Sequence, residues 1–398
     1  MSSSRRGAAE GRPTILQVLP SLVAGGAERA TIDVAQAIVD AGGDAIVASA
    51  AGPMAVELRR TGARHVVLPL DSKNPVTVRR NAKQLARLIE AEGVDIVHAR
   101  SRAPAWSAYW AARRTGRHFL TTFHGVYDLG GLLKRRYSSI MVRGERVIAV
   151  SDYLADHIRE NYRIEPGRIR TVRRGIDLSR FDPDRVTPER VIQLAQQWRL
   201  ADGVPVVMLA GRLSRLKGQM VFLEALARLG GTGFDRRCLI VGSEPGRGRY
   251  RAELERTAKH LGVDGIVQFT GDCRDMPAAF MLADVVVSAS IEPEAFGRVI
   301  AEAQAMGRAV IATDHGGARE QVLPRNTGWL VKPGDPEALA AALAEALAMT
   351  ADERLAIGRL AAEHARANHS KDLMCERTLG VYEELLRADA YENGPIAA

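Results

Sequence analysis

The 398-residue chain is too long for one ordinary hydrophobic core, so two domains are expected. Its composition, with 46% hydrophobic and 26% charged residues, is that of a globular enzyme, and no apolar run reaches the roughly 18 residues that a membrane-spanning helix needs. The three cysteines are too few and too widely spaced for a disulfide framework or a zinc site, which favours a reducing cytoplasm.

The net charge of +8 is concentrated in the first half of the chain. Residues 1–180 contain 29 lysines and arginines against 17 aspartates and glutamates, a net charge of +12, whereas the remainder is slightly acidic. A basic half suggests an anionic partner, such as nucleic acid, a phosphosugar or a membrane surface. A basic face that is only solvated is the alternative, and the charge pattern alone does not decide between them.

From Pro13 onward, short β-branched runs alternate with amphipathic helical stretches. The first run, residues 14–20, is followed by a glycine-rich turn and a helical pattern over residues 27–43. Strand and helix in alternation predict a parallel sheet covered by helices on both faces. The other predicted strands of this half cover residues 44–50, 65–70, 94–100, 118–124 and 146–151.

Residues 168–188 interrupt this rhythm with glycine and prolines and read as a linker, after which a second series of strands and helices begins. The sequence therefore predicts an α/β protein with two doubly wound, Rossmann-like domains facing a central cleft. Ligands of such sheets bind at the carboxyl ends of the strands. The predicted strands of the second half cover residues 204–212, 237–243, 265–271, 283–290, 309–314 and 328–334.

The expected boundaries divide the chain into five segments. Paired arginines near the start are not followed by an apolar segment, so we expect a disordered tail there rather than a secretory signal. The segments are a tail (1–12), an N-terminal domain (13–185), an interdomain linker (186–202), a C-terminal domain (203–370) and a helix returning toward the N-terminal domain (371–398).

One candidate phosphate site follows the first strand of the second half. The stretch "MLAGRLSRLKG" presents Arg212 and Lys217 five residues apart on a loop flanked by glycines. Two converging cations and close backbone approach suit a diphosphate, although the spacing is not that of a P-loop. Two solvated surface cations are the alternative for this loop taken alone.

A second candidate site lies in "EPEAFGRVIAEAQAMG", where Glu294 and Glu302 are eight positions apart. We expect Phe296, Gly297 and the two residues after them to form the first turn of a helix whose free N–H groups bind an anion. Carboxylates repel phosphate, so the two glutamates should accept hydrogen bonds from hydroxyl groups on either side of a diphosphate. A helix-capping Glu294 and a surface Glu302 are the alternative.

Seven segments together resemble a GT-B-fold glycosyltransferase of glycosyltransferase family 4, the large retaining family, over residues 14 to 390. The stretch "EAFGRVIAEA" resembles the family's pair of glutamates, and "GRLSRLKG" resembles its Arg/Lys diphosphate loop. The other five segments are "LVAGGAERA", "TTFHG", "IAVSDYLADHI", "RRGIDLSRFDP" and "TDHGGARE".

This resemblance implies a role for each candidate residue. It implies that the N-terminal domain binds the acceptor and the C-terminal domain binds the nucleotide sugar. Arg212 and Lys217 would hold the diphosphate, Glu294 the donor sugar and Glu302 the ribose. The remaining implied contacts are the backbone of Phe296 and Gly297 at the phosphates, Gly25 and Gly26 at the donor phosphate or the acceptor, His124 at the transferred sugar, and Gly242 with the "GDCRDM" loop near the base.

The expected reaction needs no metal and no cofactor. The one Asp-x-Asp motif, Asp182 to Asp184, lies beside a proline in the linker and is interpreted as structural. Retaining hydrolases place two carboxylates about 5 Å apart across the scissile bond, and no such pair stands out here. The resemblance implies front-face substitution with retained configuration, in which the departing phosphate helps to deprotonate the acceptor and the cations stabilise its charge.

The expected partners are a GDP- or UDP-sugar and a glycan or lipid-linked acceptor, such as a lipopolysaccharide core. Tryptophans and leucines near Arg113, Arg136 and Arg143 form a basic amphipathic surface that could contact anionic membrane at the inner face of the cell membrane. Ordinary helix packing of Trp106 and Trp110 is the alternative.

Other functions remain open. A phosphorylase or a sugar-nucleotide epimerase could share the fold, and a non-catalytic protein could bind nucleotide or nucleic acid through the basic half. No nucleic-acid motif or pattern of stacking aromatics is found, so a nucleic-acid partner is not expected.

Overall fold

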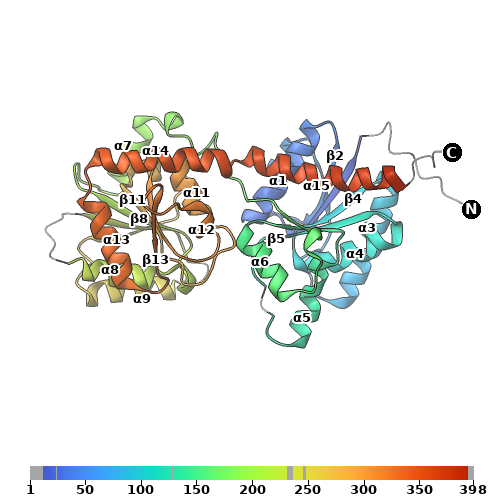
Figure 1. Cartoon of the computed structure of the whole chain (residues 1–398), viewed down its shortest axis with the longest axis horizontal. Helices are drawn as coiled ribbons and strands as arrows, with labels where there is room; N and C mark the ends of the chain where they lie inside the picture. Colours follow the sequence, from blue (N-terminus) through green and yellow to red (C-terminus); the bar gives the residue numbers. More distant parts are fainter. Residues whose placement is uncertain (1–11, 24, 128, 231–235, 245–247, 393–398) are drawn as a thin grey trace, which may run out of the picture. The chain divides into compact units, whose positions relative to one another are not determined.

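The computed structural model describes residues 12–23, 25–127, 129–230, 236–244 and 248–392 (Figure 1). The described chain forms two compact units, one of residues 12–175 with 371–392 and the other of residues 176–370. Each unit has its own parallel sheet with helices on its faces, so the predicted architecture of two Rossmann-like domains is confirmed. The expected tail, apart from residue 12, lies outside the described residues.

The sheet of the first unit has seven parallel strands in the order β3-β2-β1-β4-β5-β6-β7. Its central strands are buried on both faces, as their apolar, β-branched sequences require. Its strands are β1 (Thr14–Ser21), β2 (Asp44–Ala50), β3 (Arg64–Val67), β4 (Ile96–Ala99), β5 (His118–Phe123), β6 (Arg146–Ala149) and β7 (Ile169–Thr171).

Strand β7 is a difference from the sequence prediction, since residues 168–188 were expected to form a linker. The three residues of β7 pair with β6, and Arg170 lies opposite Ile148. A strand this short carries no periodic pattern, which is why the sequence did not reveal it.

One helix of the first unit shows clear capping residues at both ends. Helix α3 starts after Asn74, whose side chain accepts from the Val76 N–H, and ends at Gly93 in the left-handed conformation. The C-terminal helix α15 packs against α1 and contributes Met374 and Tyr382 to the core of this unit. Its helices are α1 (Gly26–Asp40), α2 (Ala55–Arg60), α3 (Pro75–Glu92), α4 (Arg102–Thr115), α5 (Leu132–Ser138), α6 (Asp152–Asn161) and α15 (Lys371–Glu392), with 3₁₀ turns η1 (Ser139–Val142) and η2 (Pro166–Arg168).

The second unit has a six-stranded parallel sheet in the order β10-β9-β8-β11-β12-β13. Two apolar cores flank it: α8, α9 and α13 pack on one face and α7, α10, α11 and α14 on the other, as Figure 1 shows for the labelled helices. Its strands are β8 (Val206–Ala210), β9 (Arg237–Val241), β10 (Val267–Gly271), β11 (Val285–Ser288), β12 (Ala309–Thr313) and β13 (Gly328–Val331).

Residues 186–202, expected to be an interdomain linker, are part of the second unit and contain α7, which packs against α10. None of the helices in the described ranges is both long and apolar enough to cross a membrane. The helices of this unit are α7 (Pro188–Gln197), α8 (Gln219–Arg228), α9 (Arg249–His260), α10 (Met276–Leu282), α11 (Arg298–Ala305), α12 (Ala318–Gln321), α13 (Pro336–Ala348) and α14 (Ala351–Asn368), with 3₁₀ turns η3 (Pro183–Arg185) and η4 (Arg215–Lys217).

Candidate functional site

A hollow of about 420 Å³ lies at the carboxyl ends of β8 and β9 in the second unit, where ligands of doubly wound sheets bind. It brings together Arg212, Gly242 and Glu302, three of the residues that the sequence singled out. Asp272 and Cys273 of the predicted base loop also line it. Its remaining lining residues are Ala210, Gly211, Val241, Ser243, Met276 and Val299.

Two glycines bring the strand ends close together at this hollow. A Cβ on Gly242 would lie 2.1 Å from the carbonyl oxygen of Gly211, and Gly242 has a φ of +139°, so no other residue fits there without strain. The Gly211 N–H donates to Val241 and the Gly242 N–H to Gly271, both at 2.8 Å. The backbone at the edge of the hollow is therefore rigidly held.

The loop after β8 presents Lys217 and Arg212 in different settings. The Lys217 Nζ lies 2.6 Å from Glu294 Oε2, and both side chains are more than two thirds buried. Gly218 anchors this loop against β11, because a Cβ there would lie 1.8 Å from the Ala289 carbonyl oxygen. Arg212 is exposed, and its side chain forms no hydrogen bond or ion pair with the described residues. Arg212 therefore remains available to a ligand.

The loop that contains Glu294 is shaped by its neighbours. The Ser290 hydroxyl donates to Glu294 Oε1, while Oε2 accepts from Lys217. The Gly317 N–H donates to the Glu294 carbonyl at 2.9 Å, and a Cβ on Gly316 would lie 2.5 Å from the same oxygen. The paired glycines of "TDHGGARE" thus allow two loops to pack backbone against backbone.

The helix after this loop begins later than predicted. Helix α11 starts at Arg298, because Gly297 takes the left-handed conformation with a φ of +88° and precedes the helix as its N-cap. Phe296 lies outside the helix, buried with its ring 5.4 Å from the ring of His369. Its carbonyl accepts from the Gln321 side chain. The prediction that Phe296 and Gly297 belong to the first helical turn was therefore wrong.

Glu302 lies on the second turn of α11 and is 8% exposed. Its carboxylate accepts from the Arg298 guanidinium at 2.6 Å and also lines the hollow. Lys217 and Glu294 do not line this hollow but pair with each other on adjoining loops. The two glutamates thus occupy distinct environments within one unit.

Three candidates belong to the first unit. Both ring nitrogens of His124 are buried and have no hydrogen-bond partner in the described part of the chain. Burial, reinforced by the charges of Arg100 and Arg174, lowers the pKa of His124 well below 6.5, so the ring is neutral. Gly25 is the N-cap of α1, and Gly26 is its first residue.

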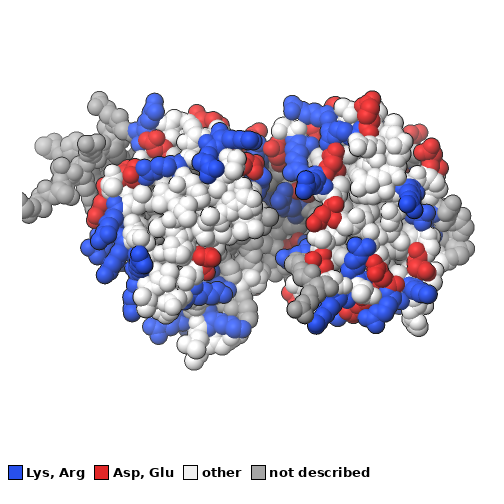
Figure 2. Space-filling model, turned by 180° about the vertical axis from the view of Figure 1, so that it is seen from behind, with Lys and Arg blue, Asp and Glu red and all other residues white. Residues whose placement is uncertain are grey.

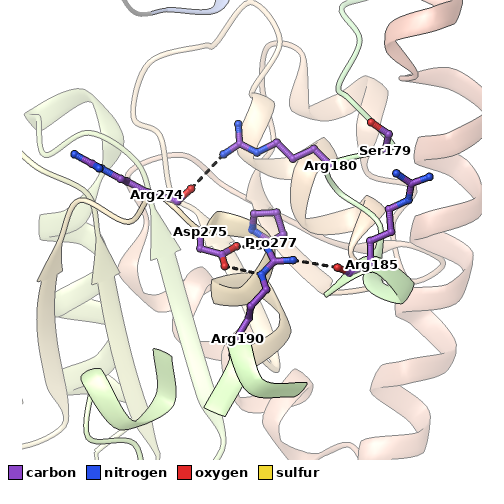
Figure 3. A pocket seen from close by; sticks show the side chains of 7 residues that line it. All are labelled: Ser179, Arg180, Arg185, Arg190, Arg274, Asp275 and Pro277. Carbon is purple, nitrogen blue, oxygen red and sulfur yellow. Dashed lines mark hydrogen bonds and ion pairs between the residues drawn. The ribbon is translucent and has the colours of Figure 1, made fainter. Parts of the chain in front are cut away.

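A second hollow of the second unit, of about 400 Å³, is lined by four arginines (Figure 3). Arg190 forms a bidentate ion pair with Asp275 and donates to the Arg185 carbonyl, while Arg180 donates to the Arg274 carbonyl. The same Asp275 caps α10. These contacts fasten residues 179–190 to the loop before α10, so we interpret this hollow as structural.

Within the described ranges, no cluster of three histidine, cysteine or acidic side chains is arranged to hold a metal ion. In the Asp-x-Asp motif, Asp182 accepts from the Asp184 N–H at 3.1 Å and caps a 3₁₀ turn. This is the structural role that was expected of it.

Comparisons with known proteins match both units. Residues 24–180 match the family model "Glycosyltransferase Family 4" and residues 192–364 match "Glycosyl transferases group 1". A glycosyltransferase of Rickettsia africae is 38% identical, with a TM-score of 0.87 over 95% of this chain and 99% of that one. The Anabaena protein HepE, solved with UDP, shares the fold at 23% identity, with a TM-score of 0.81 over 94% of this chain and 100% of that one.

Among the curated relatives is the D-inositol 3-phosphate glycosyltransferase of Corynebacterium urealyticum, 34% identical over 255 residues. The alignment covers 62% of this chain and spans 58% of that relative's length. A similar enzyme of Salinispora tropica is 33% identical over 62% of this chain and 52% of its own length.

Proposed function

Because the chain belongs to the group 1 glycosyltransferases and has the two Rossmann-like domains of the GT-B fold, we propose that it transfers a sugar from a nucleoside diphosphate sugar to an acceptor hydroxyl. The observation that carries this proposal is the hollow beside β8 and β9, which combines Arg212, an arginine without a side-chain partner among the described residues, with a buried carboxylate, Glu302. The charge of Arg212 suits a diphosphate, and the carboxylate of Glu302 can accept hydrogen bonds from ribose hydroxyls.

The nucleoside would occupy this hollow, whose volume lies within the range of small-molecule sites. Glu302 accepts hydrogen bonds from ribose hydroxyls while Arg298 holds its carboxylate in place. Asp272 and Cys273, which also line the hollow, would then contact the base. Both GDP and UDP fit this description, and UDP, bound by a protein of the same fold, is the first to test.

The diphosphate would lie between Arg212, Lys217 and the N-terminus of α11. Lys217 then exchanges the Glu294 carboxylate for phosphate, and Glu294 becomes free to accept from a hydroxyl of the transferred sugar. This exchange replaces the Lys217–Glu294 ion pair by an ion pair between Lys217 and phosphate, while Glu294 keeps its hydrogen bond from the Ser290 hydroxyl and gains one from the sugar. The two cations stabilise the charge of the leaving diphosphate, as preorganised donors do in other enzymes.

The finer features of the reaction are also proposals. Transfer occurs with retention of configuration and without a metal ion, since Arg212 and Lys217 supply the positive charge that a divalent ion would otherwise supply. Neutral His124 faces the transferred sugar and hydrogen-bonds one of its hydroxyls. The donor is handled by the second unit and the acceptor by the first.

The acceptor is proposed to be lipid-linked, with the protein docking on anionic membrane from the cytoplasm. Leu132 and Leu133, at the start of α5, are 87% and 85% exposed and precede the basic residues Arg135 and Arg136. Figure 2 shows Lys and Arg side chains around the protruding part of the first unit where α5 lies. Exposed leucines beside cations suit an anionic bilayer surface. A lipopolysaccharide core or another envelope glycan fits such an acceptor.

A thermal-shift screen followed by an assay of turnover tests the proposal. UDP, GDP, ADP and their sugars should be titrated, and one nucleoside diphosphate should raise the melting temperature of the full chain. With the sugar of the nucleotide that binds as donor, the protein should release nucleoside diphosphate faster when an extract that contains the acceptor is added. Formation of an epimer without acceptor would identify an epimerase, and release of sugar phosphate a phosphorylase. Binding of no nucleotide would contradict the proposal.

A further inference from the structure

One histidine of the second unit, His315, follows β12 and directly precedes Gly316 and Gly317. Its ring Nε2 lies 2.9 Å from the carbonyl oxygen of Ser290. Because a carbonyl oxygen only accepts hydrogen bonds, the proton must be on Nε2, which donates. The hydroxyl of Thr313, the last residue of β12, donates to the same oxygen at 2.9 Å. Two donors from the end of β12 therefore hold one carbonyl group.

Ser290 links this carbonyl group to Glu294. It follows β11, is 3% exposed, and its hydroxyl donates to Glu294 Oε1. Lys217 holds the other carboxylate oxygen at 2.6 Å. When Lys217 turns to the diphosphate in the proposed transfer, the Ser290 hydroxyl is the one donor to this carboxylate that remains among the described residues. The position of Ser290 then decides where the carboxylate points.

The main chain around Ser290 is fastened at two other places. The Ile291 N–H donates to the Leu216 carbonyl at 2.8 Å, and the Gly317 N–H donates to the Glu294 carbonyl at 2.9 Å. These contacts hold the residues that follow Ser290, but neither involves its own carbonyl group. The direction of that group is set by the two donors from the end of β12.

His315 is not needed to satisfy the buried carbonyl oxygen, because the Thr313 hydroxyl already donates to it. The ring also has a cost, since its Nδ1 is buried and has no hydrogen-bond partner in the described part of the chain. A second donor restricts the direction of a carbonyl group more tightly than one donor does. Groups that contact a substrate need such support from the residues behind them, which favours a role of the ring in function.

We propose that His315 is a positioning residue of the transfer reaction. By donating to the Ser290 carbonyl, it fixes the Ser290 hydroxyl against Glu294. The carboxylate of Glu294 then stays aimed at the transferred sugar after Lys217 has paired with the diphosphate. This role rests on the proposed function, whereas the contact between His315 and Ser290 does not.

Turnover and nucleotide affinity of His315 variants test the proposal. His315→Ala should lower kcat roughly five- to tenfold, the factor that loss of one hydrogen bond allows. Its affinity for UDP or GDP, whichever binds the wild type, should stay within about twofold, because the nucleotide is assigned to the hollow beside β8 and β9. An equal loss of kcat and of nucleotide affinity would show a general structural role and overturn the proposal.

Three variants serve as comparisons. His315→Gln keeps a donor and an acceptor and should recover most of the lost kcat. His315→Leu fills the space without a donor, so it should be as slow as His315→Ala, and it replaces that variant if His315→Ala fails to fold. His260→Ala, which changes an exposed histidine at the end of α9, should keep full activity. Equal activity of His315→Gln and His315→Leu would contradict the role of the donor.

A double variant tests whether His315 acts through Ser290. Ser290→Ala removes the hydroxyl but keeps the carbonyl group. Addition of His315→Ala to Ser290→Ala should lower kcat by less than about twofold more, because the hydroxyl that His315 positions is already gone. Two full and independent losses would place the effect of His315 elsewhere and overturn the proposal.

The contact itself can be read without any turnover. In NMR spectra of the full chain with isotope-labelled histidine, the His315 signal, identified by its loss in His315→Gln, should show the proton on Nε2. A ring with its only proton on Nδ1 would overturn the proposal. Binding of no nucleotide by the wild type would contradict the proposed function and with it the role of His315. Normal nucleotide binding with full activity of His315→Ala would overturn the role of His315 alone.

Discussion

Lys217→Ala removes one of the two cations proposed to hold the leaving diphosphate. In the resting protein, Lys217 pairs with Glu294 at 2.6 Å, and the two side chains are 26% and 29% exposed. An ion pair of this exposure contributes roughly 1 kcal/mol or less to stability. The variant should therefore fold and lose little in its free energy of unfolding.

The effect on catalysis should be much larger than the effect on folding. Removal of one preorganised donor to a developing charge raises barriers by about 2–4 kcal/mol, which corresponds to roughly 30- to 1000-fold in rate. Lys217→Arg should recover part of this loss, because it restores the charge with a different shape. Nucleoside diphosphate release from the donor that binds, at saturating acceptor, measures both variants.

A matched control is available in the same unit. Lys332 also pairs with an acid, Asp335 at 3.7 Å, but is 79% exposed. Lys332→Ala should keep full activity. Equal losses in Lys217→Ala and Lys332→Ala, or full activity of Lys217→Ala, would refute the assignment of Lys217 to the diphosphate.

Three further predictions concern metal, membrane and pH. Treatment with EDTA should leave turnover within about twofold of the untreated enzyme, because cations of the protein hold the diphosphate; an absolute need for added Mg²⁺ or Mn²⁺ would contradict this. Replacement of Leu132 and Leu133 by aspartate should weaken sedimentation with phosphatidylglycerol vesicles more than tenfold, since each buried leucine contributes roughly 1.5–3 kcal/mol; unchanged sedimentation would exclude α5 as the membrane contact. Burial lowers the pKa of His98 and His124 well below 6.5. On acidification, these two histidines are therefore protonated at a higher pH in the unfolded chain than in the folded protein. Stability should be fully present above pH 6.5 and fall below it by up to about 1.4 kcal/mol per pH unit for each histidine, and His124→Gln should reduce that slope in melts at a series of pH values.

Residue patterns along the chain were sufficient to predict the fold. Buried parallel strands such as Val206–Ala210 are short apolar runs, and residues such as Asn74 and Gly93 mark the beginning and the end of a helix. Glu302 could be singled out because its motif follows a predicted strand, and Gly242 was named from the family resemblance. Strands, helix caps and short motifs can be predicted because each depends on residues only a few positions apart in the sequence.

Long-range pairings could not be predicted in this way. Lys217 and Glu294 are 77 positions apart, and nothing in either motif indicates that they form an ion pair. The burial of Arg100 and Arg174 was missed because exposed arginines are the rule, and burial depends on the packing of α1 and α15 against the sheet. One signal was present, since "VHAR" places Arg100 directly after a buried strand.

Calorimetric titration of UDP and GDP into the wild type and three glutamate variants tests the central claim most directly. One nucleotide should bind the wild type, and Glu302→Gln should weaken it roughly tenfold or more, the value of a hydrogen bond to a charged group. Glu294→Gln, which changes a residue assigned to the transferred sugar, and Glu345→Gln, an exposed control on α13, should bind it as the wild type does. Unchanged affinity in Glu302→Gln, or loss in Glu294→Gln alone, would contradict the placement of the nucleotide in the hollow beside β8 and β9.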